Sequence, residues 1–143
     1  MPIVVDVNVI ISSLLSNGMS FDVFLLNSLL KKFDFIAPEY LLMELERHEQ
    51  ELLDYTKISQ QDFKNVLEFI IEEITFIPHS NFSDKLVEAR SFLSKHTKDV
   101  PYLALSLKCN SCPIFSGDKI LKKLSPVNVL SPRDLLDVLF NTK

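Results

Sequence analysis

The chain has 143 residues, of which 47% are hydrophobic and 24% charged, and its formal net charge is −4. This length makes about one domain, and the composition is that of a folded protein rather than a disordered one. No apolar run approaches the roughly 18–20 residues of a membrane span, and the N-terminus lacks the basic region of a signal peptide. We therefore expect one cytoplasmic domain over residues 1–143, with no membrane association.

The first half of the chain alternates short β-branched segments with longer amphipathic ones. The run Ile3-Val4-Val5 is typical of a strand buried on both faces, and Ser59 is a typical helix N-cap. In chain order, the pattern predicts a strand at 3–5, helices at 9–15 and 21–32, a strand at 33–37, and helices at 39–55 and 59–73.

The second half continues the alternation. It predicts a strand at 74–77, a helix at 83–94, a helix that opens at Asp99, a strand at 113–116, a helix at 118–124, a strand at 127–130 and a helix at 133–140. Strands that alternate with helices imply an α/β fold, with a central, mostly parallel sheet of about five strands and helices on both faces. In such sheets, sites form beyond the carboxyl ends of the strands.

Charge is unevenly distributed along the chain. Residues 39–54 hold six acids and one base, whereas residues 91–133 hold seven bases and two acids. A polyanion could therefore approach the C-terminal part despite the acidic total. On charge alone, a set of solvated helix faces is the favoured explanation.

Three aspartates stand where predicted strands end or predicted helices begin. Asp6 follows the first strand, Asp118 follows the strand at 113–116, and Asp99 precedes a helix. Taken singly, each is better explained as an N-cap. Taken together, they would meet at one edge of the sheet if the first strand and the strand at 113–116 are neighbours. A fourth acid, Glu44, flanks the apolar stripe of its helix, where spacing alone favours a solvated side chain.

Carboxylates that converge repel one another, so a cation is expected among them. Oxygen ligands without histidine or thiolate suit Mg²⁺ or Mn²⁺ rather than Zn²⁺. Such ions commonly serve phosphate chemistry.

Four segments in order carry a family resemblance: residues 3–12 (IVVDVNVIIS), 37–45 (APEYLLMEL), 98–105 (KDVPYLAL) and 116–119 (SGDK). With them the chain resembles the PIN domain, a three-layer fold of metal-dependent ribonucleases. The resemblance implies that four acids are catalytic and bind the metal, namely Asp6, Glu44, Asp99 and Asp118. It gives a supporting polar role to Asn8 and Ser116. Many members have one more acid near the third motif, where this chain has Val100 and Pro101.

The resemblance leads us to expect an endoribonuclease dependent on Mg²⁺ or Mn²⁺. Glu44 would be a ligand or a base that orients water, and Lys119 would steer or hold a phosphate, unless it is merely a solvated helix residue. Many small PIN proteins resemble toxins that cleave RNA and are blocked by an antitoxin. The expected partners are therefore RNA and an antitoxin protein. An excess of apolar surface also favours a homodimer or higher homo-oligomer.

Two other classes of protein stay open. One is a PIN-like scaffold that binds RNA or protein without cleaving it. The other is a phosphoacceptor receiver domain, which needs paired acids after its first strand, whereas here Asp6 lies between Val5 and Val7. The pair Cys109 and Cys112 is interpreted as structural, because a closed zinc site needs four ligands and no second pair exists.

Overall fold

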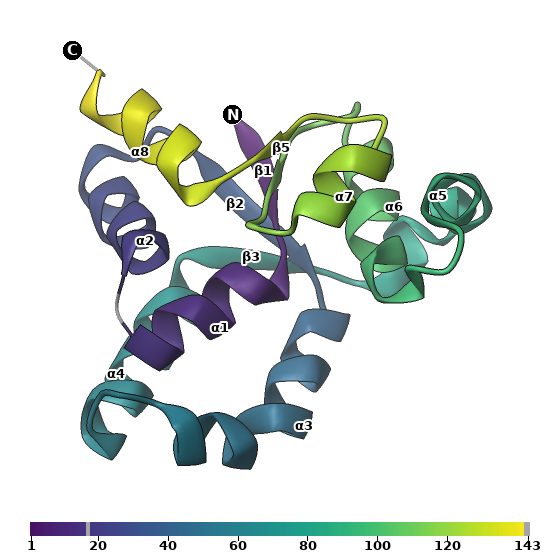
Figure 1. Ribbon diagram of the computed structural model, residues 1–143. Coiled ribbons are helices and arrows are strands. Elements are labelled where there is room, and N and C mark those ends of the chain that lie inside the picture. Colours follow the sequence, from purple (N-terminus) through teal and green to yellow (C-terminus); the bar gives the residue numbers. More distant parts are fainter. Residues whose placement is uncertain (17, 142–143) are drawn as a thin grey trace.

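The computed structural model describes residues 1–16 and 18–141, and it has a central sheet between two layers of helices (Figure 1). All strand pairs are parallel, in the order β3-β2-β1-β4-β5. The strands are β1 (Pro2–Val5), β2 (Asp34–Pro38), β3 (Ile74–Ile77), β4 (Ile114–Phe115) and β5 (Val129–Leu130). The predicted three-layer α/β fold is confirmed. The last two strands are shorter than expected, with only two residues each.

The helices are α1 (Val7–Ser16), α2 (Met19–Leu30), α3 (Tyr40–Tyr55), α4 (Gln60–Glu72), α5 (Leu86–Leu93), α6 (Val100–Lys108), α7 (Lys119–Leu124) and α8 (Pro132–Phe140). In Figure 1, α1, α2, α4 and α8 lie on one side of the sheet, and α5, α6 and α7 lie on the other. The helix predicted at 83–94 is partly wrong: residues Ser83–Lys85 form a separate 3₁₀ turn before α5 begins.

The central strand β1 is buried on both faces, as its β-branched run predicted. Ile3, Val4 and Val5 are each 0% exposed. On one side the ring of Phe24 packs against Phe35 and Phe115, with centroid distances of 5.3 and 5.6 Å. Such aromatic contacts add to the free energy gained from burying apolar area. β1 pairs with β4 in the register Val5 to Phe115, on which the geometry of the sheet edge depends.

The helices of this fold are short. Within residues 1–16 and 18–141, no single helix is long and apolar enough to cross a membrane. The consecutive helices α1 and α2, which bend relative to each other, are together long and apolar enough for a membrane span, by length and composition only.

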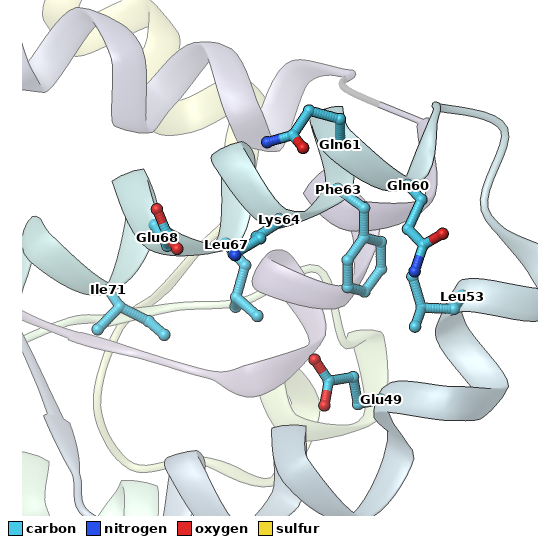
Figure 2. A pocket seen from close by; sticks show the side chains of 9 residues that line it. All are labelled: Glu49, Leu53, Gln60, Gln61, Phe63, Lys64, Leu67, Glu68 and Ile71. Carbon is cyan, nitrogen blue, oxygen red and sulfur yellow. The ribbon is translucent and has the colours of Figure 1, made fainter.

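A groove of about 610 Å³ separates α3 from α4 (Figure 2). Phe63 and Leu67 of α4 point into it, and Glu49 and Leu53 of α3 face them. Phe63 is buried, whereas Leu67 is half-buried and lines the groove.

Candidate active site

Asp6 and Ser116 lie at the carboxyl edge of the sheet, directly after the neighbouring strands β1 and β4. Val5 of β1 pairs with Phe115 of β4, so the residues that follow them, Asp6 and Ser116, lie side by side. The Ser116 hydroxyl donates a hydrogen bond to Asp6 Oδ2 at 2.7 Å, and both side chains are buried. The expectation that these two strands are neighbours is confirmed.

The Ser116 hydroxyl also holds the two loops that leave these strands. Asn8 Nδ2 donates to Ser116 Oγ at 3.2 Å, and the backbone N–H of Asp118 donates to the same oxygen at 3.0 Å. In return, the N–H of Gly117 donates to Asn8 Oδ1 at 3.3 Å. One hydroxyl therefore ties Asp6, Asn8 and the start of α7 together.

Asp118 does two things at once. Its Oδ1 accepts from the N–H groups of Ile120 and Leu121, at 2.8 and 3.1 Å, and so caps α7. It also lies close enough to Asp6 and Asp99 for its negative charge to raise their pKa values. The capping interpretation is right for this residue, and it does not exclude a second role.

Asp99 differs, because it makes no side-chain capping bond although it stands at the N-cap of α6. Burial is the main cause that raises its pKa to about 7. The negative charges of Asp6, Asp118 and Glu44 raise the pKa of Asp99 further. Its interpretation as a structural cap is therefore wrong.

Glu44 is buried on α3, which makes the sequence expectation of a solvated acid wrong. The hydroxyl of Tyr102 on α6 donates to Glu44 Oε1. Burial is the main cause that raises the Glu44 pKa, and the bond from Tyr102 opposes this effect. The spacing of apolar residues in α3 shows that Glu44 lies beside the apolar face of that helix. It does not reveal that Tyr102 of α6 contacts Glu44 there.

The four acids line one cavity of about 150 Å³ at the carboxyl edge of the sheet. It is lined by Asp6, Val7, Asn8, Glu44, Lys98, Asp99, Tyr102 and Asp118. Burial raises the pKa of Asp6 to about 6; the bond from Ser116 opposes this, and the charges of Glu44 and Asp118 add to it. The acids therefore share one electrostatic environment, although they come from parts of the chain more than 100 residues apart.

A comparison with protein families matches the PIN domain over residues 4–126. The chain belongs to the PIN domain family. Members of this family are generally nucleases, and the nucleases typically use divalent metals. No protein with curated annotation matches the chain.

The donor chemistry of the cavity fits the metals that PIN nucleases use. Four carboxylates with neither histidine nor thiolate are the hard oxygen ligands that Mg²⁺ and Mn²⁺ prefer. Within residues 1–16 and 18–141, no three His, Cys, Asp or Glu side chains already stand as a formed metal site. Burial first, and the charges of neighbouring acids second, raise the pKa values of Asp6 and Asp99, and a cation bound among these carboxylates would oppose both effects.

Two residues of this PIN cavity were missed by the sequence analysis. Lys98 is the residue before Asp99, and its positive charge opposes the rise in the pKa values of Asp99 and Glu44. Tyr102 is 1% exposed. A tyrosine in a largely apolar helix was the available signal, since a buried hydroxyl needs a partner.

Lys119, expected to hold a phosphate, is exposed on α7 and is not among the residues that line the cavity. The cysteines lie at the opposite end of α6 from Asp99. Both are free, and burial raises the pKa of Cys112 to about 12, so this group is a thiol at neutral pH. That favours the structural interpretation of the pair.

Proposed function

We propose that the protein is a ribonuclease that hydrolyses phosphodiester bonds of single-stranded or structured RNA with Mg²⁺ or Mn²⁺. The observation that carries the proposal is the cavity into which four separate elements bring Asp6, Glu44, Asp99 and Asp118. Membership of a family of nucleases supports it.

In this proposal, Asp6, Asp99 and Asp118 hold the cation, and Glu44 is a further ligand or orients the attacking water. When bound, a divalent cation offsets the charge that develops on the phosphoryl oxygens and makes water a better nucleophile. Ser116 and Asn8 keep Asp6 in place through the bonds described above. Lys98 attracts a phosphate to the mouth of the cavity. Water attacks phosphorus while the bond to O3′ breaks, which leaves a 5′-phosphate and a 3′-hydroxyl.

Incubation of the full chain with end-labelled single-stranded RNA tests this function. We expect cleavage with Mn²⁺ or Mg²⁺ and none with EDTA, and Zn²⁺ should not be the preferred ion. Cleavage that persists in EDTA would overturn the metal mechanism. Binding of RNA without cleavage under any of these ions would favour the non-catalytic scaffold.

We also propose that the protein acts in the cytoplasm as the toxin of a toxin–antitoxin pair. The groove between α3 and α4 supports a protein partner, because apolar side chains line it and its charged residues are two acids, Glu49 and Glu68, against one base, Lys64, as suits a basic segment of an antitoxin. Expression in a bacterial host should arrest growth, and Asp6→Asn should abolish the arrest. Co-expression of a small reading frame adjacent to the gene should also relieve it. Normal growth on expression of an active nuclease would contradict the toxin role.

A further inference from the structure

Tyr102 contacts the one acid of the cavity that comes from α3. Its ring is buried in α6, it lines the cavity, and its hydroxyl donates to Glu44 Oε1. It stands three residues after Asp99, so one face of the first turn of α6 presents both side chains to the cavity. The bond therefore connects α6 with α3 across the acid cluster.

Glu44 needs such a contact to stay where it is. The charges of Glu44 and Asp99 repel each other, and the side chain of a glutamate has three rotatable bonds through which it could turn away. Tyr102 occupies Oε1, whereas no hydrogen bond from the described residues reaches Oε2. Since no buried side-chain oxygen among the described residues lacks a partner, Oε2 is accessible to solvent.

We propose that Tyr102 is a positioning residue, which holds Oε1 of Glu44 so that Oε2 stays available to a divalent cation in the acid cavity. This inference rests on the proposed function and adds to it a residue that is not an acid. Holding the ligand before the cation arrives lowers the entropy lost on binding. Groups that orient metal ligands in this way typically contribute about 10- to 100-fold in metal affinity.

A purely structural role for Tyr102 makes a different prediction. In that case the hydroxyl would only satisfy its own hydrogen bond within the core, and its loss would change the free energy of unfolding but not the affinity for metal. Tyr102→Phe separates the two roles, because it keeps the ring packing and removes only the donor to Glu44.

The experiment is a calorimetric titration of the full chain with Mn²⁺, for wild type, Tyr102→Phe and the control Tyr55→Phe. Tyr55 is 74% exposed at the end of α3, outside the cavity. We expect Tyr102→Phe to weaken Mn²⁺ binding about 10- to 100-fold and to slow RNA cleavage, and we expect no change for Tyr55→Phe. Melting in EDTA checks that each variant is folded, and low temperature keeps a destabilised variant folded during the titration.

A double-mutant cycle completes the test. In a Glu44→Ala background, Tyr102→Phe should not weaken Mn²⁺ binding further, because the carboxylate that it positions is gone. Wild-type affinity in the single variant Tyr102→Phe, or an equal loss in both backgrounds, would overturn the inference and leave the nuclease proposal standing. Failure of wild type to bind Mn²⁺ or to cleave RNA would instead overturn the proposed function itself.

Discussion

Asp6 is held by a hydroxyl rather than by a positive charge. Ser116 donates to it at 2.7 Å, and the negative charges of Glu44 and Asp118 act on it from the cavity. A buried carboxylate in such surroundings opposes folding when it is ionised. The acids of the cavity are therefore expected to lower the stability of the metal-free protein.

The first prediction concerns replacement of these acids by amides. Asp6→Asn, Asp99→Asn and Asp118→Asn should each abolish RNA cleavage, yet melt at or above wild type in EDTA, because one repelling charge is removed. Asn caps a helix about as well as Asp, so α7 should not lose its cap in Asp118→Asn. Thermal melts by circular dichroism measure this.

The same variants are also compared with wild type by the stability that each protein gains when Mn²⁺ is added. A ligand that binds only the native state stabilises it by about 2.7 kcal/mol at 100 times its dissociation constant. Wild type should gain this stability on addition of Mn²⁺, and the variants should gain less. Variants that melt well below wild type in EDTA, with no shift by Mn²⁺ in any protein, would show that the acids are structural.

The second prediction concerns the pH dependence of stability without metal. Carboxyl groups of the unfolded chain have pKa values near 4, whereas those of Asp6 and Asp99 are raised to about 6 and 7 by burial and neighbouring acids. Between about pH 4 and 7 the folded state therefore binds more protons, so the free energy of unfolding falls as pH rises through this window. For Asp6, which is 3% exposed, the loss is on the order of 3 kcal/mol.

Denaturant unfolding in EDTA at a series of pH values measures this effect. The difference between wild type and Asp6→Asn isolates it from the titration of surface acids, which both proteins share. The stability of wild type relative to Asp6→Asn should fall between about pH 4 and pH 6, which are the unfolded and folded pKa values of Asp6. A difference that is constant over that range would contradict the raised pKa of Asp6.

Among the elements, α7 combines a cap that faces the cavity with a basic surface. Asp118 begins the helix, and the exposed Lys119, Lys122 and Lys123 follow it. Positive charge next to a nuclease cavity attracts the phosphate backbone of RNA, and salt weakens that attraction. α7 is therefore the element on which we expect the flanking nucleotides to rest.

The third prediction tests this role of α7. Lys119→Glu with Lys122→Glu should weaken RNA binding more than Lys31→Glu with Lys32→Glu, a matched pair at the end of α2. The apparent dissociation constant, measured by fluorescence anisotropy at several salt concentrations, gives the comparison. Binding of the wild type should weaken as salt rises. If the two pairs of substitutions weaken RNA binding equally, the basic residues of α7 are solvated helix residues and not an RNA-binding surface.

The strands and helices also show which parts of the fold could be predicted from the sequence. Strand β3 was predicted with its bounds, and β1 was recognised because Ile3-Val4-Val5 is buried on both faces. The three aspartates were singled out by their positions at predicted strand ends and helix starts, and the resemblance assigned a catalytic role to them and to Glu44. The cavity that all four share is seen only in the folded structure. Glu44 was misjudged and Tyr102 was missed because the hydrogen bond between them joins two different helices, α3 and α6. The periodicity of one helix carries no information about the helix that it contacts.

The whole molecule exposes apolar side chains where α2 and α8 pack against each other. Leu25, Leu29, Leu30 and Phe140 are between 43% and 74% exposed. We propose that a second copy of this chain covers this patch. A two-fold interface joins identical patches, so these apolar side chains would pack against the same side chains of the second copy.

The fourth prediction follows from this patch. Wild type should sediment as a dimer at micromolar concentration, and Leu29→Asp should convert it to a monomer with little change in melting temperature. Val87→Asp is the matched control, since Val87 is equally exposed on α5, outside the patch. A wild type that sediments as a monomer, or a Leu29→Asp variant that stays dimeric, would show that the patch is not the interface.

The position of β1 in the centre of the sheet has a consequence for synthesis of the chain. Among the five strands, β1 is made before the others, and its partner β4 begins more than 100 residues later, so one edge of β1 has no neighbour while the residues between them are being translated. Unpaired apolar edges of this kind are prone to aggregate. Since Asp6 and Asp118 lie on either side of that late pairing, a nascent chain cannot assemble the cavity before β4 and the start of α7 have emerged from the ribosome. Any cleavage of RNA by a nascent chain therefore waits until Asp118 has joined Asp6 in the cavity.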